Sequence, residues 1–474
     1  PHHVVNFNQL WQGAARYGGI GIASINNDTK FNTQTLTMPQ AASFKMRHTI
    51  TGHGSQGEFG QNGGVITHYF NVNGGPNEFS WNITQLCSDN VVYPQGGTWV
   101  YTRQGWCPGQ SSLLKEFDIT QYVTPGGTVT LDYNCSNPQV SGGDYRYLVA
   151  SQLVSYGPAN RATDAAILDV LAPSDKAAYS RTNPVCGNPI IRIQNTGSVT
   201  ATSIEIDYWM NNSPVKQTYT FTGSLAFMDT ATVVLPINSL WGHGITATGN
   251  VFHAEIKSVN ASADTYTVNN VYHSPFVMVD ILPPSFVIEF KTNNNPFDNA
   301  YRIVDETGAT VLGGSQLTAA NTIYSDSYYM EGCYTLIVED YGGDGLQWWA
   351  NTAQGSGYVN IRDANNNLLK SFQSDFGKYF EYSFTTYNPL SVKSNALSNA
   401  YRIYPNPSHN AFSIEGDLEN SEVKLCDVLG HIVAAPLQRN GKGIVVNTSG
   451  LVPGVYYVSI SDARGVSVRK VIIN

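Results

Sequence analysis

Hydrophobic and polar residues alternate with a period of two along most of the chain. In the stretch TSIEIDYW, Ile204, Ile206 and Tyr208 fall on one face and acidic residues fall on the other. This alternation is typical of half-buried strands. Turn sequences such as NTGS (195–198) and ETGA (306–309) separate strand pairs and supply the Gly or Asn that positive φ requires. The pattern predicts an all-β protein in which hairpins dominate.

Composition agrees with this fold class and excludes two classes of function. Only 13% of the 474 residues are charged, which is poor material for long helices, and the length predicts several hydrophobic cores. The net charge of −9 argues against nucleic acid as a partner, because nucleic-acid proteins gather Lys and Arg on one face. No run of about 18 apolar residues is present, so no transmembrane helix is expected.

Composition and linkers divide the chain into five parts. Residues 1–160 have the densest aromatic and Gly content, and residues 161–279 have the strand rhythm of an Ig-like β-sandwich. A further β-sandwich is expected for residues 285–386, after Leu-Pro-Pro. A polar linker, residues 387–400, separates it from a last small sandwich, residues 401–474.

The six cysteines are too scattered for a C-x-x-C metal site, and their number fits disulfides in an oxidising compartment. A metal thiolate site is the alternative. No charged-then-apolar leader is found at Pro1, which indicates a mature form or a fragment of a longer protein.

The last part contains four motifs in a fixed order: YRIYPNPSHNAFSI (401–414), VKLCDVLGHIV (423–433), GLVPGVYYVSI (450–460) and VRKVIIN (468–474). Together they resemble the C-terminal sorting domain of type IX secretion cargo of Bacteroidetes. The resemblance implies export across the outer membrane by the type IX translocon and its carrier barrel, to the cell surface or the medium. The alternative is an unrelated small sandwich with a YPNP turn.

The first part contains TITGHGSQGEF (49–59), THYFNVN (67–73), TRQGWCPG (102–109) and LVSYG (153–157). These motifs resemble the second, C-terminal lobe of the peptide-N-glycosidase F family. The resemblance implies a jelly roll for residues 1–160. Family enzymes pair this lobe with an earlier jelly roll that carries a key aspartate, and neither is in this sequence.

The resemblance implies catalytic roles for Glu58 and Arg103 in hydrolysis of the amide that joins asparagine to N-acetylglucosamine. A carboxylate can orient or deprotonate water, and a guanidinium can hold a carbonyl oxygen or a sugar hydroxyl. Trp106, Phe59 and His53 are the candidate substrate-binding residues. The alternatives are a solvated Glu58, an Arg103 that only stacks on aromatic rings, a core Trp106 and a plain loop position for His53.

The resemblance also implies a disulfide between Cys87 and Cys107, since the family has a bridge at the matching places. Cys135 with Cys186 is the second pair that we expect, and the remaining two cysteines are expected to be free thiols. The chain departs from the family beside Glu58, because two bracketing cysteines of the characterised enzyme are replaced here by Gln56 and Gly60. The loop has therefore changed shape.

The third part suggests a different chemistry. The sequence EDYGGDG gathers Glu339, Asp340 and Asp344 around glycines, which lets oxygen ligands converge on a structural Ca²⁺. The spacing does not match an EF-hand, and a plain acidic hairpin is the alternative. Trp348 and Trp349 follow directly; if exposed they suit a carbohydrate or partner surface, and if buried they belong to the core.

These observations predict a secreted or cell-surface protein that acts on N-linked glycoproteins as a peptide-N-glycosidase-type amidase, with no cofactor for catalysis. The catalytic N-terminal lobe lies outside this chain. The alternative is an adhesin or carbohydrate-binding protein that keeps the jelly roll without catalysis. An upstream jelly roll with an acid able to face Glu58 would separate the two.

Overall fold

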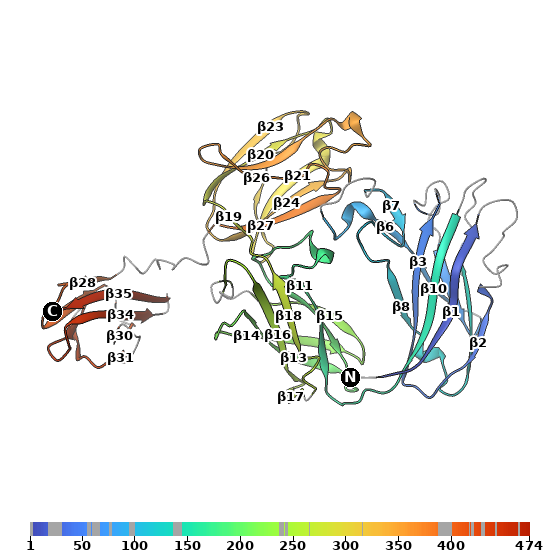
Figure 1. Ribbon diagram of the computed structural model, residues 1–474, viewed down its shortest axis with the longest axis horizontal. Helices are drawn as coiled ribbons and strands as arrows, with labels where there is room; N and C mark the ends of the chain where they lie inside the picture. The colour runs from blue at the N-terminus through green and yellow to red at the C-terminus, as the bar shows by residue number, and fades with distance from the viewer. Residues whose placement is uncertain are drawn as a thin grey trace. The chain divides into compact units, whose positions relative to one another are not determined.

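The computed structural model describes most of the chain, in two compact units, residues 1–390 and 391–474. The described residues are 3–17, 31–54, 58, 67–74, 78–93, 100–135, 145–236, 241, 245–264, 266–314, 316–386, 401–416, 418, 421–427, 432–440, 443–462 and 465–474. Phe59 and the expected linker, residues 387–400, lie outside them. The prediction of an all-β protein is confirmed: strands form paired sheets throughout both units (Figure 1).

The first region of unit 1 is a sandwich of two four-stranded antiparallel sheets. One sheet has the order β1 (Val4–Tyr17), β10 (Tyr145–Tyr156), β3 (Ser43–His53) and β8 (Leu114–Asp118). The other has the order β2 (Gln34–Thr37), β9 (Thr128–Cys135), β4 (Thr67–Val72) and β5 (Glu78–Asn82). Strands close in sequence mostly alternate between the two sheets, and this is the arrangement of a jelly roll.

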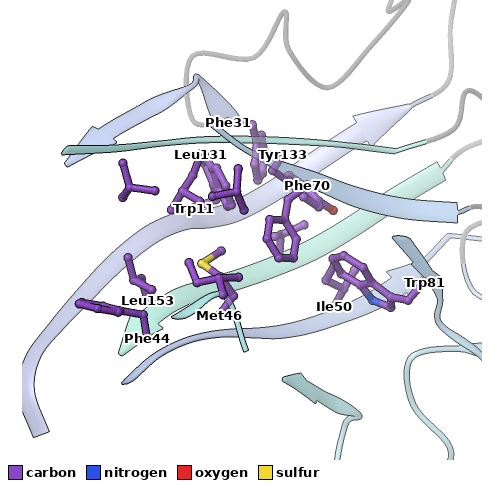
Figure 2. Packing of buried hydrophobic residues seen from close by; sticks show 14 of the residues in the cluster. Trp11, Phe31, Phe44, Met46, Ile50, Phe70, Trp81, Leu131, Tyr133 and Leu153 are labelled. Carbon is purple, nitrogen blue, oxygen red and sulfur yellow. The ribbon is translucent and has the colours of Figure 1, made fainter. Parts of the chain in front are cut away.

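The core of the jelly roll lies between the two sheets. Along β3, fully buried residues alternate with partly exposed ones, as the period-two pattern requires. Trp11, Phe44 and Phe70 are 0% exposed and pack with the other residues of this core (Figure 2). The core supplies a rigid support for the loops at the end of β3.

A short hairpin lies outside the two sheets. It consists of β6 (Thr84–Leu86) and β7 (Thr102–Gln104), and a 3₁₀ turn, η3 (Cys87–Asp89), follows β6. A second 3₁₀ turn, η4 (Thr120–Tyr122), connects β8 to β9. The strand β7 carries the candidate site residue Arg103.

The second region packs a three-stranded sheet against a five-stranded one around its own core. The three-stranded sheet has the order β11 (Ala165–Ala172), β12 (Ile190–Asn195) and β15 (Thr230–Val234). The larger sheet has the order β14 (Gln217–Leu225), β13 (Ala201–Met210), β16 (Asn250–Val259) and β17 (Ser262–Ala263), and β18 (Val271–Phe276) also pairs with β16. A 3₁₀ turn, η5 (Ala177–Tyr179), follows β11.

The third region is a second two-sheet sandwich with a separate core. One sheet has the order β19 (Asp280–Ile281), β27 (Tyr379–Thr385), β24 (Cys333–Asp340), β21 (Asn299–Asp305) and β22 (Thr310–Gly313). The other has the order β23 (Ile323–Tyr329), β20 (Ser285–Lys291), β25 (Tyr358–Asp363) and β26 (Leu368–Ser371). A 3₁₀ turn, η7 (Pro296–Asp298), directly precedes β21, and another, η8 (Thr352–Gln354), lies in the loop between β24 and β25.

A buried arginine joins the three regions of unit 1. Arg181 is 1% exposed, and it donates from Nε to the carbonyl of Asn90 and from Nη1 to the carbonyls of Phe376 and Tyr379. Its guanidinium lies 5.3 Å from the ring centroid of Tyr93 and 4.6 Å from that of Tyr379. A residue of the second region therefore stabilises the contact between the first and the third.

The disulfides follow the expectation in one case and correct it in the other. The expected Cys87–Cys107 bridge is present, with 5.5 Å between the Cα atoms. The expected Cys135–Cys186 pair is wrong, because Cys186 is bonded to Cys333, and Cys135 is buried elsewhere. Cys135 ends β9 inside the jelly roll, whereas Cys186 lies beside Cys333 in a separate small apolar cluster. Of the two cysteines expected to be free, only Cys426 is.

Unit 2 is a smaller sandwich of two four-stranded sheets with its own core. One sheet has the order β28 (Arg402–Tyr404), β29 (Ala411–Glu415), β33 (Gly443–Asn447) and β32 (Leu437–Asn440). The other has the order β31 (Ile432–Val433), β30 (Glu422–Cys426), β34 (Gly454–Asp462) and β35 (Gly465–Ile473). Within the described part of the whole chain, no helix is long and apolar enough to cross a membrane.

Candidate functional site

Glu58 and Arg103 form an ion pair at one end of the jelly roll. Nη1 of Arg103, on β7, donates to Oε1 of Glu58, which lies beyond the end of β3. The backbone N–H of Glu58 donates to the carbonyl of Gly54 at 2.9 Å, so the acid is held close to the strand end. The Arg103 side chain is 5% exposed and that of Glu58 is 25% exposed. The structure thus brings together two candidate catalytic residues that are 45 positions apart.

Aromatic rings cover the ion pair. The guanidinium carbon of Arg103 lies 4.6 Å from the ring centroid of Trp106, a cation–π contact. The ring of His53 stacks on Trp106 with 6.1 Å between centroids and 19° between planes. Trp106 Nε1 donates to the carbonyl of Gly52 at 3.1 Å. Arg103 is therefore both ion-paired and stacked, and Trp106 lies at the surface of the fold, only partly buried.

The backbone between Arg103 and Trp106 requires glycine. Gly105 has φ +77°, and a Cβ at this position would lie 1.8 Å from the carbonyl oxygen of Ile50. Only glycine lets the chain approach β3 so closely. Immediately after Trp106, the Cys87–Cys107 disulfide attaches the loop to η3. Two separate constraints thus hold Arg103 and Trp106 against the end of β3.

Burial sets the charge states of the flanking groups. It lowers the pKa of Arg103, because a charged group is disfavoured away from water, and the Glu58 carboxylate supplies the opposite charge. Burial also lowers the pKa of His53, and the positive charge of Arg146 lowers it further. The His53 ring is therefore neutral at pH 7, and its Nε2 lies 2.9 Å from Oγ1 of Thr51. The site combines a carboxylate, a guanidinium, a neutral imidazole and an indole.

Two other histidines of the jelly roll are core residues. His48 Nδ1 lies 2.8 Å from Oγ of Ser151, and His68 Nδ1 lies 2.8 Å from the hydroxyl of Tyr133. Both rings are at most 1% exposed, and burial lowers each pKa to about 3. Trp81 is 8% exposed and belongs to the same core.

The acidic loop of the third region is organised around Asp340. Asp340 ends β24, is 1% exposed, and accepts the backbone N–H groups of Asp344 and Gly345 on Oδ2, both at 2.9 Å. Glu339, the third acid of the predicted site, points away from these two: neighbouring strand residues face opposite sides, and Glu339 forms an ion pair with Arg302. Among the described residues, no three His, Cys, Asp or Glu side chains are arranged to hold a metal ion.

A third carboxylate near this loop, that of Asp298, was not identified from the sequence. A Cβ on Gly342 would lie 3.4 Å from Oδ2 of Asp340, 3.4 Å from Oδ1 of Asp344 and 3.5 Å from Oδ2 of Asp298. Burial raises the pKa of Asp340 to about 7, and the charges of Asp344 and Asp298 raise it as well. Asp298 comes close to this loop because β21 pairs with β24, which sets its chain neighbour Asn299 opposite Asp340.

The adjacent tryptophans have different surroundings. Trp348 is 6% exposed, and its ring centroid lies 5.2 Å from that of Tyr101 in the jelly roll. Trp349 is 62% exposed and Tyr341, in the acidic loop, is 65% exposed. Trp348 is thus a buried contact between two regions, and Trp349 presents an aromatic surface.

Comparisons with known proteins identify two parts of the chain. Residues 22–154 match the family described as peptide-N-glycosidase F, C terminal. The chain carries a peptide-N-glycosidase F C-terminal domain. Residues 402–474 match the family described as secretion system C-terminal sorting domain, which confirms the expected export address. The protein is therefore a type IX secretion cargo that crosses the outer membrane to the cell surface or beyond.

Solved structures overlap this peptide-N-glycosidase F C-terminal domain. One is PNGase F, a glycosylasparaginase from Flavobacterium meningosepticum, with 20% identity over 32% of this chain and 51% of that chain and a TM-score of 0.27. A structure of recombinant peptide:N-glycanase F has 22% identity, the same two coverages and a TM-score of 0.27. This chain therefore spans about half the length of those proteins. No curated protein sequence matches the chain.

Proposed function

We propose that this protein is the secreted C-terminal part of a peptide-N-glycosidase-type amidase that acts on N-linked glycoproteins. In the proposal, a preceding lobe of the family completes the site by supplying the partner acid. The observation that carries the proposal is the Glu58–Arg103 ion pair, held at the end of β3 with Trp106 against the guanidinium. All three residues lie within residues 22–154, the part of the chain that matches the family domain.

The reaction would join a water oxygen to the amide carbon of a glycosylated asparagine. The C–N bond then breaks, the sugar leaves as a glycosylamine with one proton of the water, and the asparagine becomes an aspartate. A carboxylate in an ion pair stays charged, so Glu58 would act chiefly by orienting the water or a substrate N–H. The guanidinium of Arg103 offers five N–H donors in a planar fork, so it can hold Glu58 and a substrate oxygen at once.

The rings beside the ion pair suit a sugar. Carbohydrate faces pack on aromatic side chains, and the partly exposed Trp106 stacks with His53 at the edge of the site. His53 is neutral at pH 7, so it can exchange hydrogen bonds with sugar hydroxyls without adding charge. We assign both residues to substrate binding. Phe59, the third candidate, lies outside the described residues.

A second candidate function is carbohydrate binding without catalysis. It is favoured by the exposed aromatic rings of Trp349 and Tyr341 in the third region, which lie near the buried contact of Trp348 with the jelly roll. In that case the Glu58–Arg103 pair would stabilise a loop that has lost the family's bracketing cysteines.

The test uses the full-length gene product and a denatured N-glycopeptide. The active protein should release the glycan and leave aspartate where asparagine was. Glu58→Gln keeps the shape and removes the charge, and we expect a loss of about 100-fold or more in kcat. Glu205→Gln, on the exposed face of β13, is the matched control and should leave the rate unchanged.

Two outcomes would contradict parts of the proposed function. An active enzyme that is indifferent to Glu58→Gln would remove Glu58 from the mechanism. A wild-type protein that binds the glycopeptide but releases no glycan would favour the carbohydrate-binding function.

A further inference from the structure

Two histidines, the half-buried His253 and the exposed His273, meet on the second region, away from the candidate catalytic site. His253 on β16 and His273 on β18 are direct cross-strand neighbours, and the two strands lie side by side in Figure 1. Their Nδ1 atoms are 2.6 Å apart. Neither side chain belongs to the hydrophobic core of this region, because the core uses the alternate residues of both strands.

Stacking on a tryptophan orients one histidine of the pair. Trp209 on β13 is the cross-strand neighbour of His253, and their rings stack with 5.1 Å between centroids and 9° between planes. On the other side of His253 in the sheet lies His273, on a strand that pairs only with β16 among the described strands. The stacked indole limits rotation of His253, so one imidazole is already oriented toward the other.

The charges around the pair nearly balance. Lys216 lies over Trp209, with Nζ 3.8 Å from the ring centroid, and within 3.6 Å of Glu255. Glu255 follows His253 on the same face of β16 and is also 3.2 Å from Lys257. Asp207, opposite Glu255 on β13, adds a second carboxylate. A cation approaching the imidazoles therefore meets two carboxylates as well as two ammonium groups.

We propose that His253 and His273 form a surface site for a divalent transition-metal ion, with Cu²⁺ bound most tightly and Ni²⁺ and Zn²⁺ more weakly. Imidazole nitrogen is a preferred ligand of these ions, and their order follows the general affinity series. Two nitrogens at about 2.0–2.1 Å from one metal, at angles of about 90–109°, lie about 2.8–3.4 Å apart. The observed separation of 2.6 Å needs only a small opening of an exposed side chain to reach this value.

The remaining coordination positions would be taken by water or by Glu255. Glu255 and His273 are diagonal neighbours across β16 and β18, which is within reach of a long side chain. Its carboxylate is held by Lys216 and Lys257, so recruitment as a ligand would release two weak surface ion pairs. The proposal does not depend on the amidase reaction, because the site lies in a different region of unit 1.

The experiment is a calorimetric titration of the tag-free full chain with Cu²⁺, Ni²⁺ and Zn²⁺ salts. We expect one saturable metal site per chain that depends on His253 and His273. The melting temperature should rise when metal is added. His273→Gln should weaken the site by at least about 10- to 100-fold, the loss that even indirect supporting residues of metal sites cause. His253→Gln should do the same.

Controls separate this site from general metal binding. His409→Gln, an exposed histidine of unit 2, should leave the titration unchanged. Fluorescence offers a local readout, because Cu²⁺ at the pair should quench Trp209; Trp209→Phe should remove that quenching and keep the binding. An unchanged titration of His273→Gln overturns the proposal, and so does a wild-type chain with no saturable site.

Discussion

Replacement of Asp340 by asparagine should stabilise the protein at neutral and alkaline pH. Asp340 is 1% exposed, and its Oδ2 already accepts two backbone N–H groups. Its Oδ1 accepts Nδ2 of Asn299 at 3.0 Å, while Oδ1 of Asn299 is buried without a hydrogen-bond partner. A rotated Asn299 amide would accept a hydrogen bond from a protonated Asp340, or from the side-chain amide that Asp340→Asn introduces. A neutral group at this position therefore satisfies both side chains.

The magnitude follows from the pKa of Asp340, which burial and the nearby charges raise from 3.8 to about 7. A difference of roughly three units corresponds to about 4 kcal/mol, at about 1.4 kcal/mol per unit. The folded pKa lies above the unfolded one, so the contribution of the neutral carboxyl is fully present below pH 3.8 and is lost as the pH rises through 7. The wild-type protein should lose up to about this much stability over that window.

The assay is calorimetric unfolding of the full chain between pH 4 and 8, for wild type, Asp340→Asn and the control Glu306→Gln, which alters an exposed acid of the same region. Asp340→Asn should flatten the pH dependence and raise the transition of the third region at pH 8. The control should behave as wild type. A variant no more stable than wild type at pH 8 would refute the reasoning, since the buried charge would then have no cost.

The same proteins test the predicted Ca²⁺ site. A cation held by Asp340 and Asp344 would neutralise the buried charge and bind only the folded state. Added Ca²⁺ should then raise the melting temperature of wild type at pH 8, a chelator should lower it, and Asp340→Asn should respond to neither. If wild type is also insensitive, the hydrogen-bonded acidic turn is sufficient and the Ca²⁺ prediction is wrong.

Two further predictions concern the junctions of the chain. Arg181→Met leaves three backbone carbonyls without their charged donor, so calorimetry should show that the free energy of unfolding falls by about 3–5 kcal/mol. Arg192→Met, at an exposed position, is the control. A fall below about 0.5 kcal/mol for Arg181→Met would contradict the assigned role. Deletion of residues 402–474 should leave unit 1 folded, because unit 2 has its own core, and should trap the protein in the periplasm; surface delivery of the shortened protein, measured by cell fractionation, would contradict the sorting role.

Much of the architecture could be predicted because it depends on local patterns of the sequence. Period-two alternation and Gly-Asn turns depend on neighbours a few residues apart, so the all-β class follows from them directly. The sorting domain and the jelly-roll domain were recognised from contiguous motifs, and the family matches at residues 402–474 and 22–154 agree with them. The Cys87–Cys107 bridge came with the second resemblance.

The candidate site was only partly predictable. The motifs named Glu58, Arg103 and Trp106, but the ion pair and the stacked rings depend on how β7 approaches β3. That approach rests on Gly105, whose missing side chain leaves room for the carbonyl of Ile50. In a sequence with many loop glycines, nothing indicates that this one makes such a contact.

The sequence by itself determined which segments become strands, where the cores form and where the export address lies, because each depends on residues close together along the chain. Only the tertiary structure decided which distant groups meet. Cys186 pairs with Cys333 across 147 positions, Arg181 joins three regions, and His253 faces His273 across two strands. Such contacts depend on strand register and sheet packing; a shift of one residue in the register of β16, for example, would turn His253 to the opposite face of its sheet.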